Sequence, residues 1–168
     1  NRQLRHIADT DKLTGMYNRG ALDRLLEEEI RRSSEKMEPL SLMVLDVDNF
    51  KTINDSFGHL IGDASLMCVA NIIQESVLEI DFPGRWGGDE FMVIMRDADS
   101  EAALKIGERI RRNVEAFSME NGMLRMSISG GIATLHGLDD KDSLFKRADD
   151  ALYRAKYQFG KNNVQIIR

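Results

Sequence analysis

The chain has 168 residues, of which 42% are hydrophobic and 30% charged, and its 23 basic and 28 acidic residues give a net charge of −5. This length suits one domain with one substantial core, and the acidic balance argues against a nucleic-acid partner and against direct contact with an anionic membrane. The sequence contains neither a secretory signal pattern nor an apolar run of the roughly 20 residues that a membrane span needs. Its single cysteine, Cys68, fits a reducing compartment. We therefore expect a cytoplasmic location, whether the chain is free or part of a larger, membrane-anchored protein.

The first 36 residues are predicted to contain two helices separated by a turn-rich connector. Residues 1–10 have the pattern of a helix end that arrives from upstream, and the chain starts with asparagine, so we expect it to be part of a longer protein. The connector ends at Asn18, a residue type that often caps a helix N-terminus. The apolar periodicity after Asn18 predicts a helix that runs to about Lys36.

Residues 40–48 form the strongest predicted strand. Their near-continuous apolar run is typical of a central strand that is covered on both faces. Asp46 and Asp48 stand at its end on alternating positions, which places both side chains on one side of the sheet. Ligand groups gather at the carboxyl ends of such strands. Asp48 is also suited to capping the next helix, whereas Asp46 lies where burial should still be high.

Residues 49–63 are predicted to form a short helical turn and then a loop that contains Gly58 and Gly62. Backbone N–H groups at such a turn can bind phosphate oxygens, and Lys51 adds positive charge. Asp63 suits the N-cap of the following helix as well as a ligand-binding role. His59 has no second histidine or cysteine at ligand spacing, so we exclude a zinc site.

The sequence Gly87-Gly88-Asp89-Glu90 is predicted to be the tight turn of a hairpin. A weak strand over residues 80–82 is expected to end at Pro83-Gly84, and the apolar residues 91–95 are expected to form a buried strand. Adjacent glycines let the backbone approach a ligand closely, and two carboxylates at a strand start suit a magnesium–nucleotide site. The same residues also suit an ordinary hairpin turn without a ligand.

The rest of the chain alternates helices and strands around one sheet. The elements expected there are a helix from Asp99 or Ser100, a strand over residues 123–135, a helix over 144–155 that Gly160 ends, and a strand over 164–167. Gly130-Gly131 in the middle of the first of these strands predicts a bulge or close backbone packing. The fold class is therefore an α/β or α+β sandwich, with helices packed on one sheet.

The carboxylates of two predicted strands can meet at one edge of this sheet. Asp46 ends one strand, and Asp89 and Glu90 open another. Magnesium prefers a few hard oxygen ligands together with substrate phosphates, and two metals can bring a nucleophilic oxygen and an α-phosphate together. The residues alone predict metal-dependent chemistry on a nucleoside triphosphate.

Several long motifs also resemble the GGDEF domain of bacterial diguanylate cyclases, in the same order and over essentially the whole chain. They are Asp11-x-Leu13-Thr14-Gly15-x-x-Asn18-Arg19, Asp46-x-Asp48-x-Phe50-Lys51-x-x-Asn54-Asp55, Gly58-His59-x-x-Gly62-Asp63, Arg85-x-Gly87-Gly88-Asp89-Glu90-Phe91, Ala148-Asp149-x-Ala151-Leu152-Tyr153-x-Ala155-Lys156 and Gly160-Lys161-Asn162.

The resemblance implies an α+β fold like the palm of nucleotidyl cyclases, with a central, mainly antiparallel sheet, flanking helices and the GGDEF β-hairpin. Residues 1–10 would end an upstream signalling helix, and residues 11–168 would form the catalytic domain. The implied activity condenses two GTP to cyclic di-GMP and two pyrophosphates by metal-assisted attack of a 3′-hydroxyl on an α-phosphate. Each domain binds one GTP, so catalysis requires a homodimer, which an upstream sensory or dimerisation domain would align.

By similarity, the metal ligands are the side chains of Asp46 and Asp89 and the carbonyl of Val47. The metal is expected to be Mg²⁺ or Mn²⁺, at two ions per GTP. Asp89 is the candidate to deprotonate the 3′-hydroxyl, and Glu90 would shape the metal site.

The resemblance also assigns the contacts of the substrate. Asn54 and Asp63 would recognise the guanine edge, because a carboxylate can accept from the ring N–H and the exocyclic amine together, and His59 would lie near the nucleoside. Relatives that make mixed adenine–guanine dinucleotides carry another residue in place of Asp63, so Asp63 favours GTP. The remaining substrate-binding residues are Asn49, Phe50, Lys51, Gly88, Lys156 and Lys161.

The chain departs from the family at two sites. Many relatives have an Arg-x-x-Asp product-inhibition site, of which only Asp81 is present, because Leu78 takes the place of the arginine. Leucine cannot make bidentate contacts to phosphate or guanine, so we expect weak or no product inhibition. Three residues instead of two separate Lys156 from Gly160, and this extra residue turns the chain by about 100°. The resemblance therefore supports a phosphate-binding role less strongly for Lys161 than for Lys156.

The main alternative function is a catalytically silent GTP-binding regulatory module. The intact Gly87-Gly88-Asp89-Glu90-Phe91 and Asp46 argue against it, because silent members usually lose one of these residues. A cyclic di-GMP receptor is disfavoured by Leu78, and a mixed-dinucleotide synthase by Asp63.

Overall fold

The computed structural model describes residues 2–121 and 124–167, apart from the side chains of residues 4–7 and 119–121. In chain order its elements are α1 (Arg2–Asp9), α2 (Arg19–Lys36), β1 (Leu40–Val47), α3 (Phe50–Phe57), α4 (His59–Ser76), β2 (Phe82–Gly87), β3 (Glu90–Arg96), α5 (Ser100–Asn121), β4 (Ile128–Thr134), α6 (Lys141–Tyr157) and β5 (Val164–Ile167). No helix in this described part combines the length and apolar character needed to span a bilayer.

The five strands form one sheet in the order β2-β3-β1-β4-β5. Strand β1 runs antiparallel to both of its neighbours, β2 runs antiparallel to β3, and β5 runs parallel to β4. All eight residues of β1 are buried. The predicted α+β class with a mainly antiparallel sheet is therefore confirmed.

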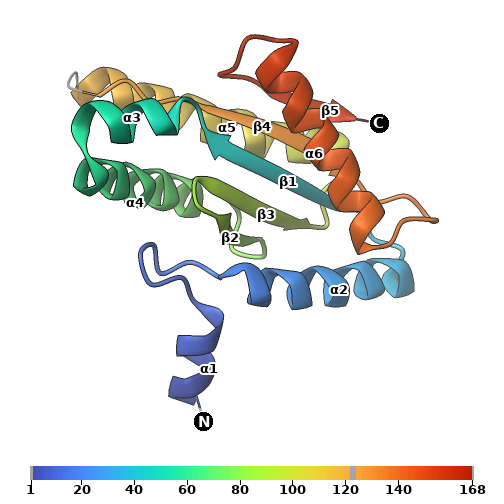
Figure 1. Ribbon diagram of the computed structural model, residues 1–168. Coiled ribbons are helices and arrows are strands. Elements are labelled where there is room, and N and C mark those ends of the chain that lie inside the picture. The colour runs from blue at the N-terminus through green and yellow to red at the C-terminus, as the bar shows by residue number, and fades with distance from the viewer. Residues whose placement is uncertain (1, 122–123, 168) are drawn as a thin grey trace.

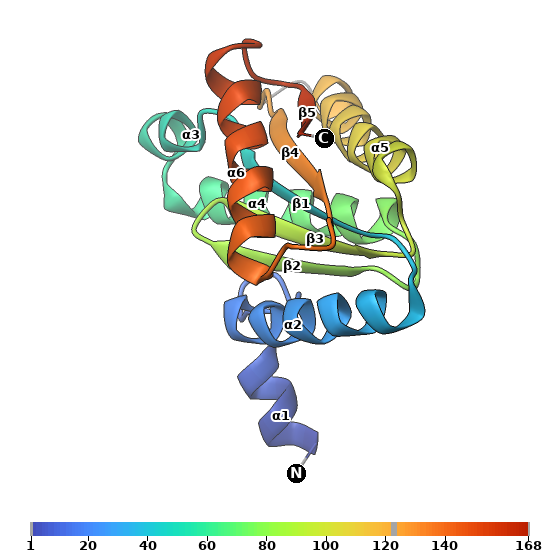
Figure 2. The ribbon, with the colours of Figure 1, turned by 90° about the vertical axis from the view of Figure 1, so that its right-hand side faces the viewer.

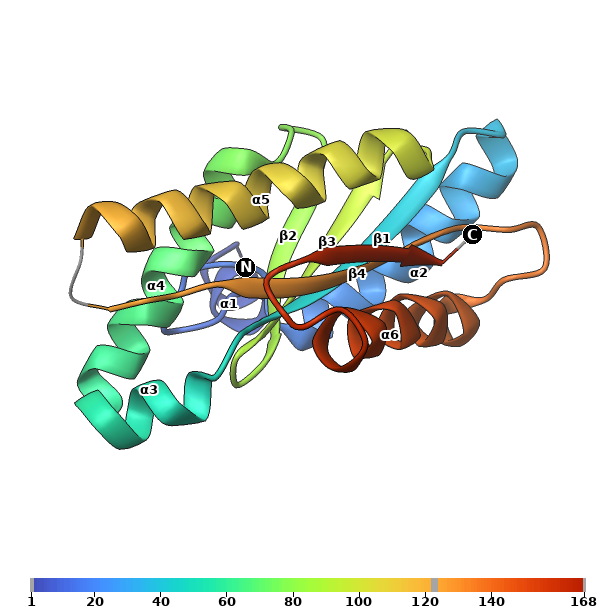
Figure 3. The ribbon, with the colours of Figure 1, turned by 90° about the horizontal axis from the view of Figure 1, so that it is seen from above.

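Helices cover both faces of this sheet. Helices α4 and α5 lie on one face and α2 and α6 on the other, so α5 and α6 flank the sheet from opposite sides in Figure 3. Alternate residues of β1 contribute to the two cores: Met43 and Leu45 pack toward α4 and α5, and Leu42 and Val44 toward α2 and α6. Strand β1 is thus held rigidly from all sides, which fixes the groups at its end.

Helix α1 projects away from the sheet at the start of α2 (Figures 1 and 2). The predicted helix in residues 1–10 is present as α1. The predicted N-cap of α2 is confirmed, because the side chain of Asn18 accepts the backbone N–H of Ala21 at 3.0 Å.

Two predicted strand boundaries were wrong. The strand expected at residues 80–82 is β2, which runs on through Pro83 and Gly84. Proline is tolerated there because β2 is an edge strand, and a Cβ on Gly84 would lie 2.6 Å from Leu22, so α2 packs closely on it. Strand β4 begins at Ile128 rather than at residue 123, which itself lies outside the described residues.

The paired glycines of β4 serve close packing and not a bulge. Strand β4 keeps a regular register with β1. A Cβ on Gly131 would lie 2.2 Å from the carbonyl oxygen of Ala148 and from the backbone nitrogen of Leu152. Only glycine lets α6 approach β4 so closely, and this approach carries Lys156 toward the end of β1.

The predicted loop before Asp63 was also wrong, because helix α4 already begins at His59. Gly58, with a φ of 87°, takes the chain from α3 into α4 without a side-chain cap. Asp63 is therefore an exposed residue inside α4, and its predicted capping role is excluded. Asp48 does not cap a helix either, since the residue before α3 is Asn49.

Candidate active site

Asp46, at the end of β1, is a buried carboxylate that the fold satisfies only in part. Its residue is 3% exposed, and the strand register places it opposite Glu90 of β3 and Ser129 of β4. Oδ2 forms an ion pair with Lys156 of α6, whereas Oδ1 has no hydrogen-bond partner among the described residues. Burial raises the pKa of Asp46 to about 6, although Lys156 acts in the opposite direction.

The pKa of Lys156 is raised, as is that of Asp46. Burial alone would lower the pKa of this ammonium, but its hydrogen bond to Asp46 and the negative charges of Asp46 and Asp89 outweigh burial and raise the pKa. Asp89 and Asp48 in turn contribute to the raised pKa of Asp46. These charged groups therefore lie close enough to act on one another.

The tip of the β2–β3 hairpin lies against the end of β1. The backbone N–H of Val47 donates to the carbonyl of Asp89 at 3.2 Å, and Figure 3 shows the turn beside the point where the chain leaves β1. Asp89 is half-buried, while Gly88 and Glu90 are exposed. The predicted convergence of the Asp46 and Asp89 strands is therefore confirmed.

Arg85 ties the hairpin tip to the connector before α2. Its guanidinium donates to the carbonyl of Gly88 at 3.1 and 2.8 Å and to both carboxylate oxygens of Asp11 at 3.2 Å. Asp11 also accepts the backbone N–H and the hydroxyl of Thr14 at 2.9 and 2.8 Å. Burial would raise the pKa of Asp11, but the bonds from Thr14 and Arg85 outweigh it and lower the pKa. This contact joins two of the family motifs, and neither motif by itself predicts it.

Asp48, two residues after Asp46, has a structural role. Its carboxylate accepts the hydroxyls of Ser127 and Ser129, both at 2.7 Å, and the backbone N–H of Asn162 at 3.0 Å. It therefore joins the exit of β1, the start of β4 and the loop after α6. The alternation of Ser127 and Ser129 was visible in the sequence, but their common partner was not.

Lys161 belongs to the loop after α6 and contacts the turn after β1. Gly160, Lys161 and Asn162 have φ values of 77°, 67° and 48°, and Asn49 also has a positive φ, of 56°. The ammonium of Lys161 donates to Asn49 Oδ1 at 2.7 Å. Lys161 thus lies at the edge of the predicted phosphate turn, where it contacts the side chain of Asn49.

Helices α3 and α4 carry the residues predicted to bind the base. Asn54 Oδ1 is buried and has no hydrogen-bond partner among the described residues. A Cβ on Gly62 would lie 1.8 Å from this oxygen, so glycine leaves room for the amide. Asp63 and His59 are exposed on the first turns of α4.

The first turn of α3 carries the other residues predicted to contact phosphates. Lys51 is exposed, while Phe50 is half-buried and packs on the core. The structure thus gathers the predicted residues at one end of the sheet, from β1, α3, α4, the hairpin and α6. What each does for a substrate stays a prediction.

Asp81 holds the turn between α4 and β2. It is 6% exposed, accepts the backbone N–H of Leu78 at 2.8 Å, and has one oxygen without a hydrogen-bond partner in the described structure. Burial raises its pKa against the opposing effect of this bond. The side chain of Leu78 is 48% exposed. The remnant of the inhibition motif therefore has a role in the fold.

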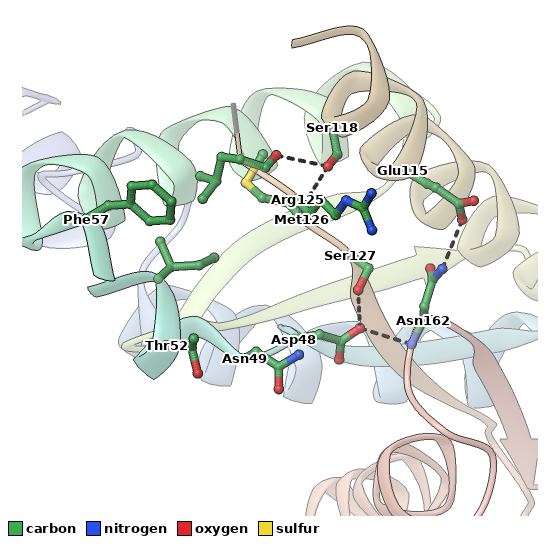
Figure 4. A pocket seen from close by; sticks show the side chains of 12 residues that line it. Asp48, Asn49, Thr52, Phe57, Glu115, Ser118, Arg125, Met126, Ser127 and Asn162 are labelled. Carbon is green, nitrogen blue, oxygen red and sulfur yellow. Dashed lines mark hydrogen bonds between the residues drawn. The ribbon is translucent and has the colours of Figure 1, made fainter. Parts of the chain in front are cut away.

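A cavity of about 1030 Å³ lies behind the candidate site and contains neither Asp46 nor Asp89. Its lining includes Asp48 and Asn49, and it extends to Phe57 and Arg125 (Figure 4). In this view Asp48 bridges Ser127 and the backbone of Asn162, so its carboxylate is already hydrogen-bonded. We place the candidate site at Asp46 and the hairpin, where a buried carboxylate oxygen without a partner lies beside Asp89.

The donor set partly fits a divalent metal. The described residues contain no group of three histidine, cysteine, aspartate or glutamate side chains arranged to hold one by themselves. The orphaned oxygen of Asp46 and the neighbouring Asp89 nevertheless offer hard oxygen ligands. Such a set suits Mg²⁺, which is commonly bound by one or two carboxylates together with substrate phosphates.

Fold and site define a mixed α/β domain whose acidic and basic groups converge at the end of a central strand. Residues 8–163 match the family model "Diguanylate cyclase, GGDEF domain". The chain therefore belongs to the GGDEF domain family.

Relatives of known identity agree with this family. The chain is 40% identical to diguanylate cyclase DgcP of Pseudomonas aeruginosa, over 96% of this chain and 24% of that protein. It is 42% identical to response regulator PleD of Caulobacter vibrioides, over 94% of this chain and 36% of that protein. The chain thus spans less than two fifths of the length of these relatives.

Solved structures show the same fold. The coiled coil and GGDEF domain of DgcB from Caulobacter crescentus, in complex with c-di-GMP, superposes with a TM-score of 0.93 at 31% identity, over 99% of this chain and 89% of that one. The active GGEEF domain of a diguanylate cyclase from Vibrio cholerae gives a TM-score of 0.84 at 34% identity, over 90% of this chain and 97% of that one.

Proposed function

We propose that this chain is the catalytic domain of a diguanylate cyclase, which condenses two GTP to cyclic di-GMP and two pyrophosphates. The observation that carries the proposal is the half-satisfied carboxylate of Asp46, buried next to Asp89 at the hairpin tip. Buried polar atoms are nearly always hydrogen-bonded, so an orphaned oxygen at a strand end points to a ligand. Family membership supplies the reaction class.

In the proposed reaction, the 3′-hydroxyl of each GTP attacks the α-phosphate of the other. A new P–O bond forms while the bond to pyrophosphate breaks, and the hydroxyl proton leaves, with Asp89 as the candidate acceptor. Asp46, Asp89 and the carbonyl of Val47 would hold the divalent metal, which when bound neutralises phosphate charge and acidifies the hydroxyl. Glu90 adds negative charge beside Asp89.

The substrate would lie between the hairpin and helices α3 and α4. Asn54 and Asp63 are the proposed guanine contacts, and the room that Gly62 leaves for Asn54 supports this assignment. Gly88 supports the proposed position of the substrate beside the hairpin, because a Cβ on Gly88 would meet no atom within 4 Å. The fold has no steric need for glycine at Gly88, so we assign it to close approach of the nucleotide.

The proposed phosphate contacts come from the charged and polar groups around this space. They are Asn49, Phe50, Lys51, Lys156 and Lys161. Because one domain holds one GTP, two copies must face each other, and α1 is the proposed connection to an upstream domain that controls this pairing. A similar chain of Pseudomonas aeruginosa, diguanylate cyclase SiaD, is known in complex with its activator SiaC.

Incubation of the purified chain with GTP and Mg²⁺ at high protein concentration tests the activity. We expect cyclic di-GMP by chromatography from the parent and none from Asp89→Asn. Product from both proteins would disprove the role of Asp89. GTP binding without product, even when two copies are fused to a dimerising coiled coil, would favour the silent regulatory module instead.

Weak product inhibition is the second expected property, because leucine at position 78 cannot bind phosphate or guanine. We expect added cyclic di-GMP to leave the initial rate of the parent nearly unchanged and Leu78→Arg to acquire inhibition. Leu78→Lys is the matched control, since it adds charge without a bidentate donor. Strong inhibition of the parent would refute the expectation.

A further inference from the structure

Lys156 pairs with Oδ2 of Asp46, the carboxylate to which the proposed function assigns a metal, while Oδ1 has no hydrogen-bond partner among the described residues. Lys156 is the only cation that pairs with Asp46 among the described residues. We infer that Lys156 and the divalent metal are alternative counter-ions of Asp46, so that metal binding displaces the ammonium. This inference deepens the proposed function and rests on its metal site.

Burial makes a counter-ion at Asp46 necessary. The residue is 3% exposed, and the carboxylates of Asp89 and Asp48 lie near enough to act on it. An unpaired charge in such a place is expensive, so a cation must accompany it. Asp48 is already supplied by Ser127, Ser129 and Asn162. Of these two buried carboxylates, Asp46 is therefore the one that depends on a cation able to move away.

The ammonium of Lys156 can move away from Asp46 without disturbing the fold. It stands in the last turn of α6, which ends at Tyr157, and its side chain is 26% exposed. A lysine carries its charge on a flexible four-carbon stem, so the ammonium can swing into solvent while the helix stays packed. The backbone of α6 is meanwhile fixed by the close approach of Gly131.

An ammonium on Oδ2 and a divalent cation on Oδ1 of the same carboxylate would lie only a few ångströms apart. Two positive charges a few ångströms apart repel strongly when they are partly buried. The metal therefore has to compete with Lys156 for Asp46. Once displaced, the ammonium stays on the same side of the sheet, where it is free to meet the triphosphate. Metal and nucleotide should then each strengthen the binding of the other, as linkage requires.

The test measures Mn²⁺ binding by electron paramagnetic resonance without nucleotide, at pH 8. We expect the dissociation constant of Lys156→Met to be about tenfold lower than that of the parent, which corresponds to about 1.4 kcal/mol. Lys156→Arg keeps the competing charge and should bind Mn²⁺ like the parent. Lys161→Met removes a nearby cation that donates to Asn49 rather than to a carboxylate, and it should change the constant less than twofold.

The outcomes separate this inference from the proposed function. If Asp46→Asn abolishes Mn²⁺ binding but Lys156→Met leaves it unchanged or weakens it, displacement is wrong and the metal site stands. Asp46→Asn binding as tightly as the parent overturns both. An equal gain in Mn²⁺ affinity in Lys161→Met would overturn the inference, because the summed positive charge around the site, and not the Asp46–Lys156 pair, would then set the affinity. Thermal unfolding by circular dichroism checks the fold of each variant, and Lys156→Gln replaces Lys156→Met should the latter fail to fold.

Discussion

Two carboxylate–cation pairs flank the hairpin tip, and they differ in the sign of the pKa shift on the acid. Asp11 pairs with Arg85 at 3.2 Å, and its pKa is lowered because Thr14 and Arg85 together outweigh burial. Asp46 pairs with Lys156, and its pKa is raised to about 6 because burial outweighs the lysine. The ionised carboxylate is thus favoured by the fold in one pair and disfavoured in the other.

The two carboxylates differ both in burial and in how completely each is hydrogen-bonded, since the side chain of Asp11 is 20% exposed and that of Asp46 only 4%. Asp11 receives a backbone N–H, a hydroxyl and a guanidinium. Asp46 receives one ammonium and keeps an orphaned oxygen. The complete carboxylate of Asp11 is therefore expected to hold structure together, whereas the incomplete one of Asp46, at a strand end beside Asp89, is expected to bind a ligand. Asp11 and Asp46 make this contrast within one small region.

The largest expected effect is on turnover. Replacing Asp46 by asparagine removes a proposed metal ligand, so we expect cyclic di-GMP formation to fall more than about a hundredfold. Asp11→Asn is the matched change at the structural pair. It loosens the hairpin without touching the substrate and should lower turnover less than about tenfold. Initial rates by chromatography decide the comparison, and similar losses in the two variants would remove the distinction.

A smaller effect is expected at another incomplete acceptor, Oδ1 of Asn54. Gly62→Ala would place a Cβ 1.8 Å from Asn54 Oδ1, so the amide must rotate away from its present position. We expect the KM for GTP to rise about tenfold, which matches the loss of one hydrogen bond to a base. Stability should change by less than about 1 kcal/mol, because alanine also favours the helix.

Ala64→Ser, at an exposed position of the same helix, is the control for Gly62→Ala and should leave KM unchanged. An unaltered KM in Gly62→Ala would mean that Asn54 does not contact the base. A loss of folding, seen by circular dichroism, would instead place Asn54 among the structural groups.

The sequence predicts those parts of the fold that local patterns determine. The apolar run of β1 predicts a doubly covered central strand, and Asn18 predicts the start of α2, because burial and capping act over a few residues. The start of α4 escaped prediction because Gly58 replaces a side-chain cap. The extent of β2 escaped prediction because its edge position tolerates Pro83.

The site shows the same division between local and long-range information. The acidic residues were predicted from their places at strand ends and from the family motifs. The counter-ions were not: Lys156 reaches Asp46, and Arg85 reaches Asp11, only through tertiary packing. Which carboxylate is complete and which is not depends on these distant partners, so the structure was needed to tell the two apart.

The pH dependence of stability tests this contrast most directly. Urea unfolding in EDTA between pH 3 and 7 would compare the parent with Asp46→Asn and with Asp11→Asn. A raised pKa on Asp46 means a stability contribution that is present below its ordinary value of 3.8 and lost as the pH rises through about 6. The parent should therefore lose about 2 kcal/mol relative to Asp46→Asn between pH 4 and 7.

The lowered pKa of Asp11 works with the opposite sign. Its contribution is present above 3.8 and lost as the pH falls below that value, so the parent should be more stable than Asp11→Asn at pH 7 and lose this advantage toward pH 3. Opposite slopes in the two comparisons are the predicted result. Slopes of the same sign would contradict the division into a structural and a functional pair.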